Sequence, residues 1–147
     1  MPYDHSQLST FQACAERYRL RFLERLERVT DTPEDQPKRF GQALHAGLAA
    51  WYKGLGSQAV QDCFLSVFPK SLREGEQLYT PKNGLTVLQQ YLQQYGELDK
   101  SYKVLAVETP ITLLLTTDIQ YLVKLDTVLE DANGVWVMEH KSTASPK

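Results

Sequence analysis

The stretch VKLDTVLEDANGVWVMEHKS, residues 123–142, limits the fold of this chain more than any other segment. It has apolar-rich runs on both sides of DANG, residues 131–134, and Asn and Gly tolerate the positive φ angles of a tight turn. We therefore expect an antiparallel hairpin. Its first strand nevertheless contains Asp126, and its second contains Glu139 and Lys141, so these charged side chains need a partner.

The register of the hairpin decides which side chains meet. A loop formed by all of DANG places Glu130 opposite Val135 and Asp126 opposite Glu139. A tighter turn would place Asp126 opposite Lys141 instead. Because side chains alternate between the two faces of a strand, Asp126, Glu139 and Lys141 share one face in either register.

Two opposed carboxylates in such a pair repel each other, because their Cβ atoms lie about 4.5–5.5 Å apart. A divalent cation removes this conflict, since Mg²⁺ and Mn²⁺ prefer hard oxygen ligands. The alternative is a solvent-facing strand pair with a salt bridge, either Glu139–Lys124 or Asp126–Lys141. The other residues on both faces are mostly apolar, which predicts a central strand pair covered on both sides and favours a cation.

Before the hairpin, helical patterns come first and strand patterns follow. Residues 9–28 are expected to form a helix with Ser9 as its N-cap. The segments 30–38 and 69–84 are rich in turn residues and are expected to be an exposed loop and an irregular stretch. Pro110 lacks a backbone donor and marks an edge, a bulge or a break between strands. Further helices are expected over 40–54, 57–68 and 85–95, and strands over 101–109, 110–117, 118–130 and 134–142.

The composition is that of a globular protein with one core, at 147 residues, 42% hydrophobic and 23% charged. No apolar run approaches the roughly 18 residues of a membrane helix, and the first residues show no signal pattern, so we expect a cytoplasmic protein without a membrane partner. The net charge of −2 does not indicate a nucleic-acid partner, so DNA binding must depend on local charge or on a metal. Cys14 and Cys63 fit neither a disulfide framework nor a zinc site and are expected to be buried thiols.

An acid, a turn and then Glu-x-Lys on the next strand resembles the PD-(D/E)XK nuclease superfamily, with Asp126 and EHK as the signature. Two more segments are similar to its RecB-like exonuclease branch, which includes CRISPR-associated and helicase-associated nucleases. These segments are HSQLSTFQACAERYRLRF near the start and FGQALHAGLAAW, which contains His45. The matching segments run from about residue 6 to 143 in the expected order, so the resemblance covers nearly the whole chain.

The resemblance implies an α/β fold with a restriction-endonuclease-like core, in which N-terminal helices pack on a central mixed β-sheet, as a single domain over residues 1–147. It implies Mg²⁺ or Mn²⁺ as the cofactor, with His45, Asp126 and Glu139 as ligands. Without the resemblance, His45 would be interpreted as a helix histidine with an ordinary hydrogen bond.

The resemblance also implies roles for three neighbouring groups. The backbone carbonyl of His140 supplies a further metal ligand, and Lys141 orients or activates the attacking water. Glu108, in AVETP, matches an acidic position of some members and is a candidate additional acid. Asp126, Glu139 and Lys141 are thus the predicted catalytic residues.

The sequence departs from the family pattern at several points. Ala15 replaces a usual proline, and Lys124 replaces the glycine usually found before the first acid. Cys14 has the position of an early cluster cysteine, but there are no late cysteines, so no iron–sulfur cluster is expected. The sequence ends shortly after Lys141, so the C-terminal helix and strand of the core are expected to be missing and the chain to be a truncated part of a longer nuclease.

The expected function is therefore that of a metal-dependent deoxyribonuclease that hydrolyses phosphodiesters. The resemblance implies an exonuclease in DNA repair, recombination or phage DNA processing. Its expected partners are DNA, a helicase or other repair subunit, or the missing C-terminal part. Two alternatives stay open: an inactive nuclease-fold domain that binds DNA or a protein, and an unrelated helix-plus-meander domain whose hairpin acids are surface groups.

Overall fold

The computed structural model describes residues 2–26, 36–69 and 78–142. The chain forms two compact units, of which the first comprises residues 1–30 and 109–125 and the second residues 31–108 and 126–147. Each unit is described below by itself. The single domain expected over the whole chain stays a prediction.

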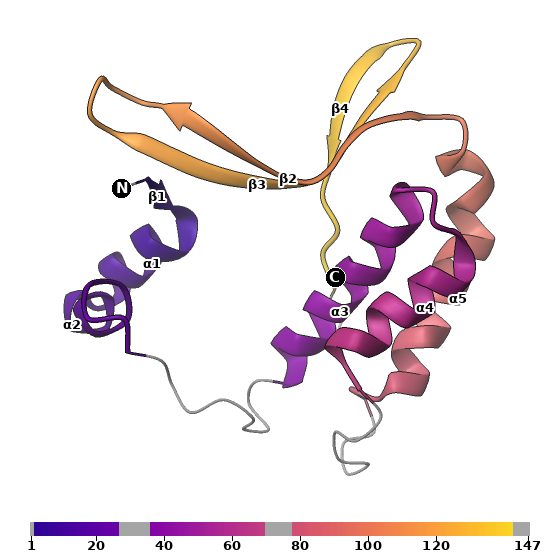
Figure 1. Ribbon diagram of the computed structural model, residues 1–147, viewed down its shortest axis with the longest axis horizontal. Coiled ribbons are helices and arrows are strands. Elements are labelled where there is room, and N and C mark those ends of the chain that lie inside the picture. Colours follow the sequence, from indigo (N-terminus) through magenta and orange to yellow (C-terminus); the bar gives the residue numbers. More distant parts are fainter. Residues whose placement is uncertain (1, 27–35, 70–77, 143–147) are drawn as a thin grey trace. The chain divides into compact units, whose positions relative to one another are not determined.

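The described residues form helices and a mixed β-sheet (Figure 1). In chain order the elements are β1 (Tyr3–Asp4), α1 (His5–Ala13), α2 (Ala15–Tyr18), the π-helical turn η1 (Arg19–Leu23), α3 (Gln36–Tyr52), α4 (Gly56–Val67), α5 (Pro81–Asp99), β2 (Lys103–Leu114), β3 (Gln120–Asp131) and β4 (Gly134–Met138). None of the described helices is both long and apolar enough to cross a membrane.

The first unit begins with a strand that the sequence did not predict. Strand β1 runs parallel to β3 and pairs Tyr3 with Tyr121. Helix α1 follows at once, because the Asp4 carboxylate caps it by accepting a hydrogen bond from the Gln7 backbone N–H at 2.7 Å. The predicted helix start at Ser9 is therefore wrong, since a better cap precedes it by more than one turn.

The first helical segment is also interrupted. Cys14 has an extended backbone, with φ −166°, and separates α1 from α2. Its thiol is exposed and that of Cys63 is partly buried, so the expected burial of both cysteines is wrong for Cys14. Residues 27–28 of the predicted helix lie outside the described residues.

The second unit contains three longer helices, all of which begin earlier than predicted, α4 by one residue and the other two by a full turn. Helix α3 already includes Pro37, and α5 begins at Pro81. Proline is favoured in a first turn because its missing N–H has no helical partner there. Thr80 caps α5 by accepting a hydrogen bond from the Asn83 N–H at 3.1 Å. Residues 30–35 of the predicted loop and 70–77 of the predicted irregular stretch lie outside the described residues. The rest of the predicted loop, residues 36–38, is the first turn of α3, so the loop prediction is wrong there.

The core of this unit is an aromatic cluster between α3, α4 and α5. Phe40 contacts Phe64 and Phe68 edge to face, with ring centroids 5.9 Å and 5.5 Å apart. Helices α4 and α5 approach closely at Gly84, where an added Cβ would lie 2.1 Å from Phe64 Cζ. Glycine is required at this crossing because any side chain would displace the Phe64 ring.

Strand β3 pairs with β1, β2 and β4, and β2 lies at an edge of the described sheet. An edge strand tolerates proline, so β2 continues through Pro110. Of the three alternatives for Pro110, the edge is confirmed and the break is wrong. The backbone of β2 is nevertheless irregular nearby, since Glu108 has φ +52°.

Strands β3 and β4 form the predicted hairpin. Glu130 pairs with Val135, and Thr127 pairs with Met138. This confirms the predicted register in which Asp126 points toward Glu139. The alternative register, with Asp126 opposite Lys141, is wrong. The pairing ends at Met138, however, so Glu139 lies just beyond the strand.

The hairpin is covered less than expected. In β3, Thr127 and Leu129 are buried, at 2% and 1% exposure. In β4, Val135, Trp136 and Val137 are more than half exposed. The prediction that both faces of this strand pair are covered is therefore wrong for β4.

Candidate metal centre

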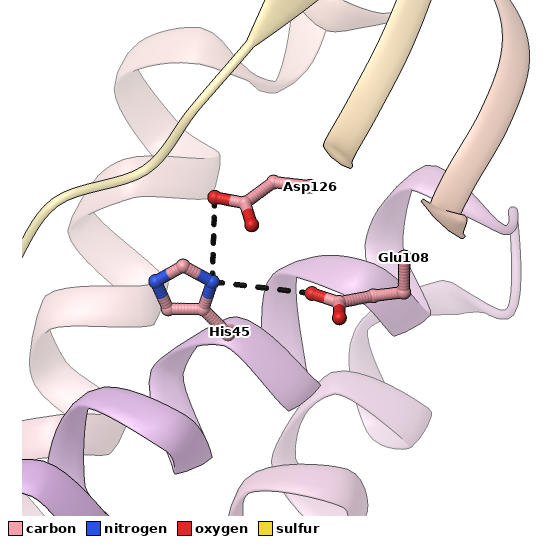
Figure 2. Close-up of side chains that lie close together, drawn as sticks. All are labelled: His45, Glu108 and Asp126. Carbon is pink, nitrogen blue, oxygen red and sulfur yellow. Dashed lines mark ion pairs between the residues drawn. The ribbon is translucent and has the colours of Figure 1, made fainter. Parts of the chain in front are cut away.

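Three side chains of the second unit, each from a different helix or strand, meet at one point (Figure 2). His45 comes from α3, Glu108 from β2 and Asp126 from β3. His45 Nδ1 lies 3.4 Å from Asp126 Oδ2 and 3.9 Å from Glu108 Oε1. All three side chains are partly buried, with exposed fractions of 30%, 22% and 18% for His45, Glu108 and Asp126.

Local structure explains how each side chain reaches this point. His45 follows the buried Leu44 on α3, which places it at the margin of the apolar face of the helix. Glu108 has φ +52°, which is uncommon for a residue with a Cβ and redirects a strand side chain. Asp126 Oδ2 accepts a hydrogen bond from the His140 backbone N–H at 2.9 Å. The chain that leaves β4 therefore restrains the carboxylate of β3.

The three groups suit a divalent cation. One nitrogen and two carboxylate oxygens, one from each side chain, all lie within 4.8 Å of one another. Ligands that share one ion at about 2.1 Å lie no more than about 4.2 Å apart, so a small contraction brings these atoms to binding distance. Carboxylates suit Mg²⁺ and Mn²⁺, and the imidazole favours Mn²⁺ over Mg²⁺. A metal ion would also offset the repulsion between the two carboxylates.

Glu139 and Lys141 pair with each other and do not belong to this group. Lys141 Nζ lies 2.9 Å from Glu139 Oε2, and the two side chains are 79% and 51% exposed. The Glu139 carboxylate raises the pKa of the Lys141 ammonium. This arrangement follows from the end of β4 at Met138, because strand alternation no longer fixes the orientation of the residues after it.

His140 contributes to the site in a way that the sequence did not predict. The role of its carbonyl as a metal ligand stays a prediction, whereas the structure shows that its backbone N–H donates to Asp126 Oδ2. The imidazole is packed against the rings of Tyr52 and Tyr91. Burial lowers the pKa of His140, and the nearby Asp126 carboxylate opposes that shift.

The sequence patterns did not identify the polar aromatic residues near His140. The hydroxyls of Tyr52 and Tyr91 lie 2.6 Å apart, and Trp51 Nε1–H donates to Asp99 Oδ2 at 3.0 Å. Tyr52 fitted the apolar face of its predicted helix, and Tyr91 lay outside the face predicted for α5. Because the helix pattern ranks residues only by hydrophobicity, it could not show that two hydroxyls from different helices would meet.

Comparison with models of known protein families shows which family this chain belongs to. A sequence model of the PD-(D/E)XK nuclease superfamily matches residues 4–147, which includes all the candidate site residues. The chain belongs to the PD-(D/E)XK nuclease superfamily. No curated protein and no solved structure matches the chain.

Membership of this superfamily agrees with the architecture. The mixed α/β structure is consistent with a restriction-endonuclease-like fold, so the predicted fold class is confirmed. The superfamily implies nuclease activity, and PD-(D/E)XK nucleases generally use divalent metals. The His45, Glu108 and Asp126 group could hold such an ion.

Proposed function

We propose that this protein is an Mg²⁺- or Mn²⁺-dependent deoxyribonuclease of the RecB-like exonuclease branch, acting on DNA ends or single strands in repair, recombination or phage DNA processing. The main support is the meeting of His45, Glu108 and Asp126 within a chain of the PD-(D/E)XK superfamily. A cytoplasmic location forms part of this proposal, because the enzyme needs access to cellular or phage DNA.

The proposed ligands are His45, Asp126 and Glu139, with the His140 carbonyl and Glu108 as further oxygen donors. When bound, a divalent ion supplies Lewis acidity and lowers the pKa of a bound water. For Glu139 to take part, its carboxylate must leave Lys141 and turn toward Asp126. Both side chains are exposed, so this exchange of partners costs little.

Lys141 has two proposed tasks in phosphodiester hydrolysis. Its ammonium, once released from Glu139, orients the attacking water and offsets the negative charge that builds on the phosphate. Water adds to phosphorus and gives up a proton, the bond from phosphorus to the leaving sugar oxygen breaks, and that oxygen takes up a proton, so the protons balance. A lysine is ordinarily a cation at neutral pH, so Lys141 keeps its charge after it leaves Glu139. Before that, the ion pair with Glu139 raises the pKa of Lys141 further.

A cleavage assay tests this function. The chain is incubated with end-labelled linear DNA and with a circular single strand, with Mn²⁺, with Mg²⁺ or with EDTA. We expect metal-dependent shortening of linear DNA and little cleavage of the circle. Asp126→Ala and Glu139→Ala should be inactive, whereas Asp62→Asn, on the surface of α4, should cleave as the wild type does. Equal cleavage by Glu139→Ala would contradict the assignment.

The second candidate is a catalytically inactive nuclease-fold domain that binds DNA or a protein such as a helicase subunit. The pairing of Glu139 with Lys141, outside the group formed by Asp126, favours it. It predicts DNA binding that weakens with salt and does not depend on Mn²⁺. Fluorescence anisotropy with labelled single-stranded DNA, with and without EDTA, distinguishes it from the first candidate.

A further inference from the structure

Two tyrosines from different helices meet the segment that follows β4. The hydroxyls of Tyr52 on α3 and Tyr91 on α5 lie 2.6 Å apart, and either can donate the hydrogen bond. Tyr52 donates its one hydroxyl proton to Met138 Sδ at 3.2 Å, and in that arrangement Tyr91 is the donor between the two hydroxyls. The Tyr91 hydroxyl lies 3.5 Å from His140 Nε2. These contacts connect two helices to the end of β4 and to the first residues after it.

The His140 ring is also enclosed by other rings. Its centroid lies 5.7 Å from that of Tyr52 and 5.9 Å from that of Tyr91, both within the range of aromatic pairs. The ring of His45 lies 6.3 Å away at an interplanar angle of 87°. With rings on several sides and a hydroxyl near Nε2, the imidazole has little freedom to move.

The two tyrosines stay neutral in this setting. Burial raises the pKa of Tyr52, and it raises that of Tyr91 as well, with further contributions from Asp99. Asp99 is itself buried and accepts a hydrogen bond from the Trp51 indole at 3.0 Å. Both phenols therefore keep the protons that their mutual hydrogen bond requires.

The backbone of the same histidine holds the metal-site carboxylate. The His140 N–H donates to Asp126 Oδ2 at 2.9 Å, and this is the oxygen that lies 3.4 Å from His45 Nδ1. We propose that Tyr52 and Tyr91 are positioning residues of the metal centre, which fix His140 and thereby aim the Asp126 carboxylate at His45. This inference rests on the proposed metal-dependent function.

Removal of single hydroxyls tests the proposal. Tyr52→Phe and Tyr91→Phe keep the rings and remove the hydrogen bonds. Tyr95→Phe is the matched control, because Tyr95 lies on the same helix with its ring against Tyr91 and is 41% exposed. The full chain is used for three measurements: the Kd of Mn²⁺ by electron paramagnetic resonance, hydrogen exchange of the His140 amide by NMR, and the urea midpoint.

We expect Tyr52→Phe and Tyr91→Phe to bind Mn²⁺ about tenfold more weakly, as is typical when a group that orients a metal ligand is lost. The His140 amide should exchange faster in both variants, and Tyr95→Phe should match the wild type. His140→Ala keeps the N–H and removes the ring, so it should weaken binding to the same extent. Combining it with Tyr91→Phe should add little further loss, because both changes act through one path.

The possible failures are distinguishable. Wild-type affinity and unchanged His140 exchange in both tyrosine variants would overturn the positioning role, even if their urea midpoints fall. If the wild type binds no Mn²⁺, the proposed function fails, and exchange of the His140 amide still decides whether the tyrosines hold this segment. If Tyr91→Phe does not fold, Tyr52→Phe and His140→Ala decide the outcome.

Discussion

His45 Nδ1 lies 3.4 Å from Asp126 Oδ2, and this contact joins helix α3 to strand β3. The same oxygen accepts the His140 N–H from the segment after β4. Three parts of the chain that are distant in sequence therefore converge on one carboxylate. Asp126 is the residue on which the candidate centre depends most.

Asp126→Asn should weaken Mn²⁺ binding by more than about 100-fold, since loss of a ligand exceeds the cost of losing a group that orients one. The amide keeps the shape of the side chain and can still accept the His140 N–H, but it has no charge. Isothermal titration calorimetry measures the effect, with Asp62→Asn as the control. Wild-type affinity in Asp126→Asn would exclude this residue as a ligand.

Replacement of Glu108 should separate backbone strain from metal binding. Its φ of +52° suits glycine better than any residue with a Cβ, so Glu108→Gly should be more stable than Glu108→Ala by about 1 kcal/mol. Both variants should bind Mn²⁺ more weakly than the wild type, because both lack the carboxylate. Urea unfolding together with calorimetry tests this pair of variants. If Ala is the more stable of the two, the strained conformation is not present in solution.

Glu139→Gln should affect cleavage and leave stability nearly unchanged. The ion pair with Lys141 is exposed, so its loss should change the free energy of unfolding by less than about 1 kcal/mol. If Glu139 turns to the metal during the reaction, cleavage should nevertheless fall by at least about 100-fold. Urea unfolding and the cleavage assay give the two values. A loss of activity that only parallels a loss of stability would argue for a structural role.

The turn of the β3–β4 hairpin should loosen in acid. The Trp136 indole and the backbone N–H groups of Asn133 and Gly134 donate to the Asp131 carboxylate and lower its pKa below 3.8. An acid with a lowered pKa stabilises the fold above its ordinary pKa, and this contribution is lost as the pH falls below about 3.8 through the lowered value. The Trp136 indole N–H resonance should shift over that range.

In Asp131→Ala the Trp136 resonance should already be shifted at neutral pH. The Trp51 indole, which donates to a different carboxylate, serves as the internal reference. A Trp136 resonance that does not move between neutral pH and pH values below about 3.8 would contradict the assignment of this hydrogen bond.

Gly84→Ala should destabilise the second unit by about 1–3 kcal/mol, because the new methyl group would collide with Phe64 in a packed core. Gly96→Ala on the same helix is the comparison, since its Cβ would meet Trp51 Cζ2 at 3.3 Å. Both substitutions gain about 1 kcal/mol of helix propensity, so the difference between them reports the collision. Equal unfolding free energies would show that α4 and α5 do not cross as closely in solution.

Much of the hairpin was predictable because turn residues and strand patterns lie next to each other in the sequence. The turn residues of DANG predicted the hairpin and limited its register to two alternatives, and the structure has the one with Glu130 opposite Val135. The loop is shorter than all of DANG, because Asp131 pairs with Gly134. The early helix starts were not predicted, since Asp4 and Thr80 act as caps through side-chain geometry that a hydrophobic pattern does not contain.

The candidate site also has a part that the sequence predicted and a part that it did not. Its chemical groups were identified from residue type, and His45, Glu108 and Asp126 do meet. The pattern could not show that β4 would end at Met138, so that Glu139 pairs with Lys141 while His140 reaches Asp126. Strand alternation predicts a face only as long as the pairing continues.

By itself, then, the sequence determined the fold class, the hairpin and the superfamily, and it limited the hairpin to two registers, because periodicity, turn chemistry and motif spacing are properties of neighbouring residues. Only the tertiary structure decided which groups come within ligand distance, how Glu108 is turned, and that Tyr52 and Tyr91 meet beside His140. Those contacts depend on how α3 and α5 pack and on where the β3–β4 pairing stops. Contacts between residues far apart in the sequence are set by the packing of the whole unit.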